Sequence, residues 1–291
     1  MRLAPGFSNY PRIMPTASVG ETHLPKNFKR YTKQFSLLEL DCEPGNVPGK
    51  AKLEACAAAA PPGFIFSLVV PSRVASLEMG PEFDKALESA LKVARLLRAQ
   101  WWVVRTPAEV RPTRRSRENL AALAARLKEG GMRVAWEPRG VWDEKAAGDA
   151  ADAIGVTLVQ DIAREEPRPG RVLYSRLLAF GKGGRVGLSL ADLVAERLRR
   201  YEESFVVVEG QGAREIQQAL GLALDDAALD AATLDEAALA GSDANGALDG
   251  AVLDDDDADD ADEGFEFGAD DDADELDDDD DADLDDEDEG R

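Results

Sequence analysis

The sequence contains very little of the two residues on which most nucleophilic and zinc chemistry depends: one histidine, His23, and two cysteines, Cys42 and Cys56, in 291 residues. Any histidine-based catalytic device or metal site would have to use His23. It lies in the loop-like segment GETHLPKN before the first clear helix, which is typical of an ordinary surface histidine. Two cysteines without a second pair nearby exclude a disulfide framework and a zinc site, and indicate free thiols in a cytoplasmic protein.

Long apolar runs and phosphate-binding glycine motifs are also missing. No stretch approaches the roughly 20 uninterrupted apolar residues of a membrane span, so we expect no membrane partner. The opening MRLAPGFSNYPRIMPTASVG lacks the apolar core of an export signal, which again favours a cytoplasmic protein. Neither G-x-G-x-x-G nor G-x-x-x-x-G-K-[ST] occurs, and we therefore expect no cofactor.

Charge divides the chain into two parts. Residues 221–291 hold 32 of the 58 acidic side chains and one of the 34 basic ones, so this segment carries −31 and residues 1–220 carry +7. The acidic segment is rich in alanine and aspartate and has too little apolar surface to offset the loss of chain entropy on folding. We predict a folded body at 1–220 and a disordered, low-complexity acidic tail at 221–291.

The body alternates between buried strands and amphipathic helices. Strands are predicted at 37–42, 64–70, 101–106, 133–139, 157–161, 172–178 and 204–210, and they are almost continuously apolar, as parallel strands covered on both faces are. Helices are predicted between them at 49–60, 81–100, 116–131, 142–155, 189–202 and 212–222, with Ser116 and Ser189 as caps. This series predicts an α/β fold, a (β/α)8 TIM-type barrel, with an irregular first strand around residues 2–10.

Charged residues stand at the end of nearly every predicted strand. Because the carboxyl ends of barrel strands meet at one mouth, and because an unpaired charge on the helix-facing side is costly, we expect these side chains to converge there. They are Glu39, Asp41, Arg73, Arg105, Glu137, Arg139, Asp161, Arg176 and Glu209.

Two interpretations fit this set. In the favoured one, the arginines bind an anionic ligand, phosphate-bearing or a nucleic acid, and Glu39, Glu137 and Asp161 are the candidates for acid or base catalysis. In the other, the charges satisfy one another, with Glu137 pairing with Arg105 or Arg176 to close the barrel. A metal held by the carboxylates is disfavoured, because the neighbouring arginines would repel a cation.

The chain also resembles a known family. The ordered series FKRYTKQFSLLELD, PPGFIFSLVVPSRVA, WEPRGVW, YSRL and FVVVEG is similar to the YecE-like barrels, the domain of unknown function 72, over roughly residues 24–220. The resemblance implies a TIM-type barrel in a family without an established activity, and it adds Tyr174 to the candidate ligand-binding residues. The chain departs from the family pattern where Val69 stands in place of an expected lysine and Leu178 in place of a histidine.

The competing hypothesis for function is a non-catalytic scaffold whose acidic tail binds a basic protein partner. The single histidine and the replaced polar motif residues favour it, since both point to a lost activity. The alternation of strands and helices is the same under both hypotheses.

Overall fold

The computed structural model describes residues 16–178 and 186–222, in which strands and helices alternate. The strands are β1 (Thr16–Glu21), β2 (Leu37–Asp41), β3 (Ile65–Val69), β4 (Trp101–Thr106), β5 (Arg133–Pro138), β6 (Thr157–Gln160), β7 (Val172–Leu177) and β8 (Glu203–Val208). The helices are α1 (Phe28–Gln34), α2 (Lys50–Ala59), α3 (Ser72–Ala75), α4 (Pro81–Leu97), α5 (Arg114–Lys128), α6 (Glu144–Ile154), α7 (Leu188–Leu198) and α8 (Ala213–Leu220). The predicted acidic tail lies outside the described residues from 223 onward.

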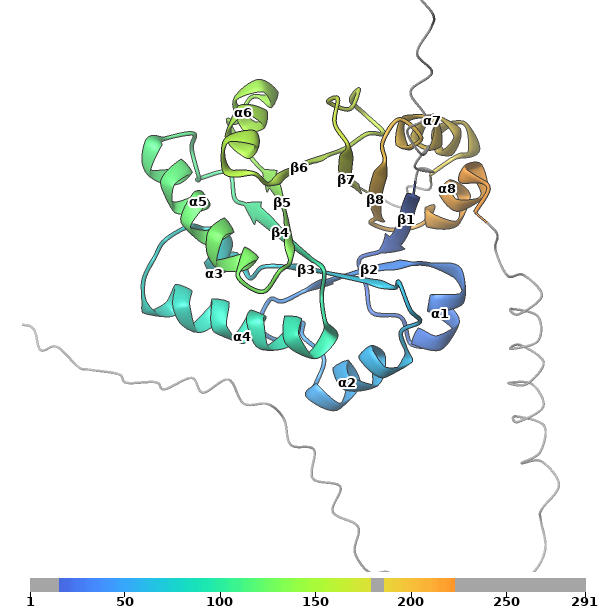
Figure 1. Cartoon of the computed structure of the whole chain (residues 1–291), viewed down its shortest axis with the longest axis horizontal. Coiled ribbons are helices and arrows are strands. Elements are labelled where there is room, and N and C mark those ends of the chain that lie inside the picture. The colour runs from blue at the N-terminus through green and yellow to red at the C-terminus, as the bar shows by residue number, and fades with distance from the viewer. Residues whose placement is uncertain (1–15, 179–185, 223–291) are drawn as a thin grey trace, which may run out of the picture. The chain divides into compact units, whose positions relative to one another are not determined.

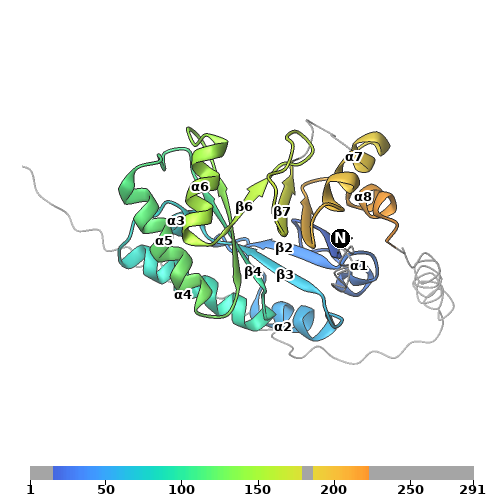
Figure 2. The same ribbon diagram turned by 45° about the horizontal axis from the view of Figure 1, so that its top comes forward.

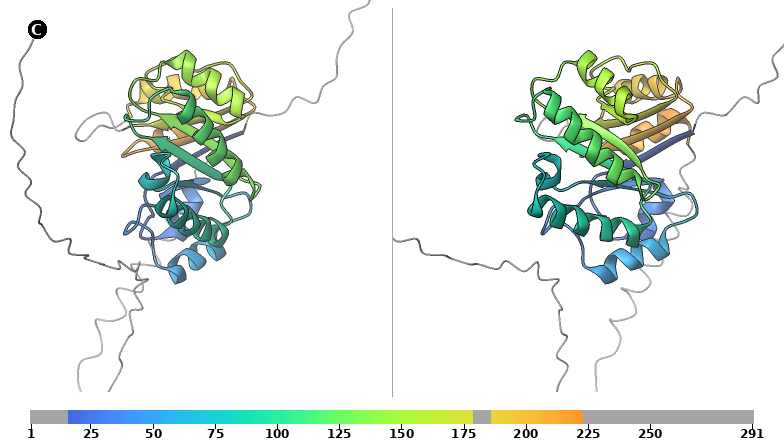
Figure 3. Two further views of the ribbon diagram at one scale, coloured as in Figure 1. Left: turned by 90° about the vertical axis from the view of Figure 1, so that its left-hand side faces the viewer. Right: turned by 60° about the vertical axis from the view of Figure 1, so that its left-hand side comes forward.

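The strands of the described ranges form a closed, all-parallel barrel in the order β1 to β8. The ring closes where β1 pairs with β8, in a register that runs from Thr16 opposite Glu203 to Glu21 opposite Val208. Figures 1 and 2 show the helices outside the strands, and Figure 3 shows α4 and α5 covering one side of the barrel. The predicted TIM-type fold class is therefore confirmed.

The first strand is not where the sequence analysis places it. Thr16–Glu21 occupies the position between β8 and β2, so the prediction of a first strand around residues 2–10 is wrong. The segment has few large apolar residues and contains Gly20, which weakens its resemblance to a buried strand. The glycine is required by close packing, because a Cβ there would lie 1.8 Å from the carbonyl oxygen of Leu37 on β2.

Two helices begin earlier than predicted. The N-cap of α5 is Thr113, whose hydroxyl accepts the N–H of Ser116 at 3.1 Å. Helix α7 has Gly187 as its N-cap without a side-chain bond, so Ser189 lies inside the helix. In α5 the polar residues Arg114 and Arg115 come before the predicted cap, and an exposed polar turn carries no apolar signal. In α7 the residue before the predicted cap is Leu188, which is exposed and follows the capping Gly187.

Alternation along the strands sorts the side chains into two layers. One set faces the helices and forms the large core with Phe83, Leu87 and Trp136, among others. The other set points into the barrel, as the two-residue period of a strand requires. The lower part of this interior is a small apolar cluster of Leu37, Val69, Trp101, Val103, Ala135, Tyr174, Phe205 and Val207.

The same inward-facing positions become charged toward the carboxyl ends of the strands. On β2, Leu37 is followed two residues later by Glu39 and then by Asp41, and on β4, Val103 is followed by Arg105. On β7, Tyr174 is followed by Arg176. The sequence pattern therefore places a polar layer on top of an apolar one, at the mouth of the barrel.

Candidate functional site

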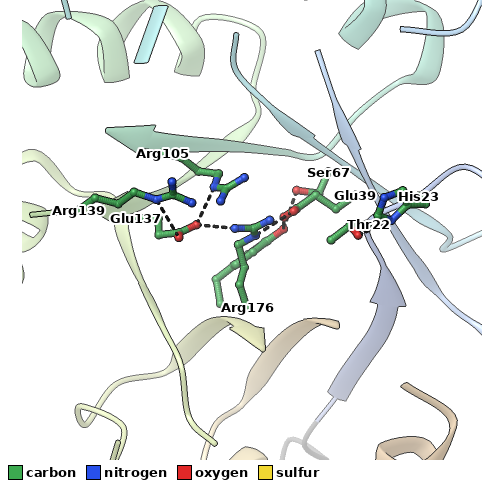
Figure 4. Close-up of polar contacts among 9 residues, drawn as sticks. Thr22, His23, Glu39, Ser67, Arg105, Glu137, Arg139 and Arg176 are labelled. Atoms are coloured by element: carbon green, nitrogen blue, oxygen red, sulfur yellow. Dashed lines mark hydrogen bonds and ion pairs between the residues drawn. The ribbon is translucent and has the colours of Figure 1, made fainter. Parts of the chain in front are cut away.

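Arg176 is the centre of an ion-pair network in the mouth of the barrel (Figure 4). Its Nε donates to Glu39 Oε1 at 2.9 Å and its Nη1 donates to Glu137 Oε2 at 2.6 Å. The side chains of Arg176 and Glu39 are only 5% and 1% exposed. Burial alone would lower the pKa of Arg176, but the carboxylates of Glu39 and Glu137 outweigh it and raise the pKa above its ordinary value. Arg176 is thus a permanent cation held between two acids.

Tyr174 extends the network toward the apolar interior. Its hydroxyl donates to Glu39 Oε2 at 2.8 Å and lies 2.7 Å from Ser67 Oγ, which must then donate to the tyrosine oxygen. Burial, with the neighbouring charge of Glu39, raises the pKa of Tyr174 well above its ordinary value, so the phenol stays protonated. These bonds fix the orientation of Glu39 from below, and through it the orientation of Arg176.

Arg105 and Arg139 approach Glu137 from the other side. Arg105 Nε lies 3.1 Å from Glu137 Oε2, and Arg139 Nε lies 3.8 Å from Glu137 Oε1. The N–H at Arg105 Nε nevertheless has no hydrogen-bond acceptor among the described residues, although the atom is buried. Burial, followed by the positive charge of Arg176, lowers the pKa of Arg105. Of the three arginines, Arg105 is therefore the one with a buried donor that lacks a hydrogen bond among the described residues.

A cavity of about 530 Å³ opens beside this network. Arg105 and Arg176 form part of its wall, together with the predicted residues Glu39, Asp41 and Glu209. The rest of the wall comes from β2, from the end of β3 and from the loops that follow β1 and β2. Those further lining residues are Thr22, His23, Leu24, Leu40, Gly45, Asn46, Pro48 and Val69.

Five predicted residues lie outside the cavity wall. Glu137 and Tyr174 belong to the network described above, and the other three are Arg73, Arg139 and Asp161. Arg73 belongs to the short helix α3 and is half exposed, with its Nη1 3.1 Å from Glu78 Oε2. Arg139 is half exposed beyond Glu137 and contributes only the long ion pair described above. Asp161 follows β6 and accepts the N–H of Ala163 at 3.1 Å.

The surroundings of Asp161 disfavour the charged form of its carboxyl group. Its Oδ2 is buried without a hydrogen bond and is 3.4 Å from Arg164 Nε. Burial raises the pKa of Asp161, and the negative charge of Glu137 adds to the effect. The charge of Glu137 therefore acts on Asp161, although no hydrogen bond between the two side chains is present in the described part of the chain.

His23 and Thr22 are two of the lining residues that the sequence analysis did not select. Both directly follow β1, and His23 Nδ1 lies 2.7 Å from Thr22 Oγ1. His23 is exposed, as the sequence analysis expects from its loop-like segment, and it also lines the cavity. His23 lies two residues after Glu21, the last residue of β1. Recognising Thr16–Glu21 as a strand would therefore have placed this histidine at a strand end, like the other candidates.

Within residues 16–178 and 186–222, no group of three or more histidine, cysteine, aspartate or glutamate side chains is placed to hold a metal ion. The acids of the network are instead paired with arginines. In the same described ranges, no helix is both long enough and apolar enough to cross a membrane.

Comparison with known proteins identifies the fold. No family model and no curated protein matches the sequence. Among solved structures, a DUF72 family protein (EF0366) from Enterococcus faecalis V583 matches with a TM-score of 0.56 and 14% identity, over 72% of this chain and 97% of that one. The chain has the fold of DUF72 family proteins.

Other solved structures match less closely. A DUF72 family protein (TM1631) from Thermotoga maritima MSB8 matches with a TM-score of 0.48 and 17% identity, over 70% of this chain and 98% of that one. D-Psicose 3-epimerase from Clostridium cellulolyticum H10 matches with a TM-score of 0.47 and 15% identity, over 70% of this chain and 97% of that one. The DUF72 neighbours agree with the resemblance seen in the sequence, and at these identities the likeness shows the fold and assigns no activity.

Proposed function

We propose that the mouth of the barrel binds a small anionic ligand, with Arg105 as its principal contact. The observation that carries the proposal is the place of Arg105 in the wall of a 530 Å³ cavity, with its buried Nε 3.1 Å from Glu137 Oε2 but outside hydrogen-bond geometry. A phosphate or carboxylate oxygen would give this guanidinium the charge-assisted hydrogen bonds that Glu137 does not supply.

The charge balance of the network supports the same ligand. Three guanidinium groups, those of Arg105, Arg139 and Arg176, share the carboxylates of Glu39 and Glu137. Arg176 is fully engaged by both acids, so the excess positive charge resides on Arg105 and Arg139. A ligand with a negative group beside Arg105 would neutralise it.

Asp41 and Glu209 also line the cavity and are negative, but both are exposed. Water screens exposed charges far more effectively than buried ones, so their repulsion of an anion beside the less exposed Arg105 is small. An anion deep in the cavity is therefore attracted by the guanidinium of Arg105 more strongly than it is repelled by the carboxylates of Asp41 and Glu209.

We propose positioning roles for two of the three catalytic candidates. Glu39 and Glu137 are occupied in holding Arg176, and Tyr174 and Ser67 hold Glu39 in turn. Such a supporting shell keeps a binding group in place before the ligand arrives. The cavity has the volume of a site for a metabolite, which favours a small molecule over a nucleic-acid strand.

The test is a titration of the full chain with inorganic phosphate by calorimetry at about physiological ionic strength. We expect saturable binding that is weakened roughly ten-fold or more in Arg105→Gln, a loss of about 1.4 kcal/mol. Arg73→Gln is the matched control, because it removes the same charge from the short helix α3, outside the cavity.

Arg105→Lys, which keeps the charge but removes the planar fork, should give intermediate affinity. Folding of each variant is checked by circular dichroism. The proposal is wrong if phosphate and simple phosphomonoesters do not bind, or if Arg73→Gln weakens binding as much as Arg105→Gln.

We also propose a cytoplasmic location. The thiols of Cys42 and Cys56 are both free and buried, which suits a reducing compartment. Fractionation of cells that express a tagged chain would test this, and recovery of the chain in an exported fraction would contradict it.

The scaffold hypothesis depends on the acidic tail, which lies outside the described residues, and it stays a prediction. A pull-down with the full chain would support it if basic proteins are retained at physiological salt and released as ionic strength rises.

A further inference from the structure

We infer that the ligand of this cavity carries several hydroxyl groups in addition to its anionic group, as a phosphorylated sugar or polyol does. The inference rests on the proposed function and adds the chemistry of the rest of the ligand. It follows from the way in which hydrogen-bonding groups are distributed over the two sides of the cavity.

The cationic side chains of the cavity wall lie on one side of the cavity, and its neutral or acidic side chains lie on the other. Figure 4 shows Arg105 on one side of the mouth and Thr22 and His23 on the other, with Arg176 and Glu39 between them. The carboxylates of Asp41 and Glu209 come from the ends of β2 and β8, the two strands that flank β1 in the barrel. A ligand that spans the cavity therefore meets guanidinium at one end and hydrogen-bond acceptors at the other.

The acceptors on the second side are largely unused. Asp41 Oδ1 accepts the N–H of Glu43 at 3.0 Å, and Asp41 makes no ion pair in the described part of the chain. The side chains of Glu209 and Asn46 have no hydrogen-bond or ion-pair partner among the described residues. Carboxylates without a cation partner accept hydrogen bonds from hydroxyl groups, each oxygen offering two lone pairs.

His23 and Thr22 complete this side. The imidazole Nδ1 and the threonine hydroxyl engage each other at 2.7 Å, which fixes the ring and leaves its other nitrogen for a ligand. An imidazole nitrogen and a hydroxyl can each donate or accept, as a ligand hydroxyl can. The two groups therefore add no charge requirement and favour hydroxyl groups as partners.

Size excludes inorganic phosphate as a complete occupant. The cavity volume of about 530 Å³ is within the range of sites for whole metabolites, and a single phosphate would leave the Asp41 and Glu209 side unfilled. A hydroxylated chain of a few carbons attached to the anion reaches both sides.

The experiment compares ligands that share one phosphomonoester and differ in the rest of the molecule. Full-length protein is titrated with glucose 6-phosphate, phenyl phosphate, ethanolamine phosphate, inorganic phosphate and glucose. We expect glucose 6-phosphate to bind at least about ten-fold more tightly than phenyl phosphate or inorganic phosphate, the gain that one or two net hydrogen bonds provide.

Glu209→Ala is the informative variant, because no hydrogen bond or ion pair joins the side chain to the described residues of the network, which its loss therefore leaves intact. This substitution should weaken the binding of glucose 6-phosphate by about three-fold or more and leave the binding of inorganic phosphate unchanged. Asp192→Ala, an exposed aspartate on α7 away from the cavity wall, is the matched control and should change neither.

The outcomes separate this inference from the proposed function. If all phosphate compounds bind equally and Arg105→Gln abolishes their binding, the proposed anion site is correct and the inference about hydroxyl groups is wrong. Tightest binding of ethanolamine phosphate would overturn it in favour of an ammonium-bearing ligand. If no phosphate compound binds, both fail.

Discussion

Arg176 on β7 bridges Glu39 on β2 and Glu137 on β5, with bonds of 2.9 and 2.6 Å across the barrel mouth. The three strands are not neighbours in the sheet, so this bridge joins parts of the ring that backbone pairing does not connect. Removing this bridge should therefore lower the stability of the whole barrel.

We predict that Arg176→Met lowers the free energy of unfolding by about 3–5 kcal/mol, because it leaves the buried carboxylate of Glu39 without its ion-pair partner. Urea denaturation of the full chain measures this. Arg139→Met, which removes a half-exposed arginine 3.8 Å from Glu137, should cost no more than about 1 kcal/mol. Equal losses in the two variants would show that the bridge is not buried as described.

Tyr174→Phe should cost about 1–3 kcal/mol, because it leaves Glu39 Oε2 and the hydroxyl of Ser67 without their partner in a buried site. A double-mutant cycle with Ser67→Ala measures the coupling, and the double variant should cost less than the two single losses combined. Strict additivity would argue against a shared hydrogen bond.

The pKa of Asp161 is raised by burial, which gives its contribution to stability a definite sign. The folded state binds this proton more tightly than the unfolded state, so stability falls as pH rises from about 4, the ordinary carboxyl value, through the folded-state pKa. Asp161→Asn removes this loss and keeps an acceptor for the N–H of Ala163.

The free energy of unfolding of Asp161→Asn relative to the unsubstituted chain should therefore increase between about pH 4 and pH 7. Urea denaturation at constant ionic strength measures the difference at each pH. Asp192→Asn serves as the control for loss of one exposed charge. A relative stability that decreases with rising pH would contradict the assignment.

Gly140, in the turn after β5, has a positive φ of 80°, and a Cβ there would lie 2.7 Å from the carbonyl oxygen of Ala108. Gly63 has a similar φ of 84° with open space around the Cβ position. We predict that Gly63→Ala costs about 1–2 kcal/mol from backbone strain alone, whereas Gly140→Ala costs clearly more. Because Gly140 follows Arg139, the second variant should also displace the turn that carries this arginine.

Thermal or urea denaturation of the two glycine variants gives the comparison, and φ is nearly the same at both positions, so the difference reports the contact with Ala108. If Gly63→Ala is the more damaging variant, the close approach of the two turns is not present in solution.

The barrel can be predicted from the sequence because its strands are buried on both faces. Segments such as 101–106 are almost entirely apolar, and the helices between them show the stripe of an amphipathic surface helix. Strand β1 escaped this reasoning, because Gly20 and the small or polar residues around it meet packing requirements that an apolar pattern does not reveal. His23 is exposed, as predicted, but its position just after a strand end could be recognised only after β1 was placed.

Alternation along the strands also predicts that Glu39, Glu137 and Arg176 point into the barrel, and they do. The pattern does not predict which charges pair. Both pairings anticipated for Glu137, with Arg105 and with Arg176, are present together. Arg73 follows β3 in sequence, but the chain turns at once into α3, where Glu43 binds the N–H and hydroxyl of Ser72 and Arg73 faces outward.

The division of labour around the cavity has an evolutionary consequence. The groups that hold the barrel together across its mouth come from strands, whereas Thr22, His23 and Asn46 come from the connections after β1 and β2. Replacements confined to those two connections could change what enters the cavity without loosening the ring. Divergence of ligand preference among barrels of this kind should therefore concentrate there.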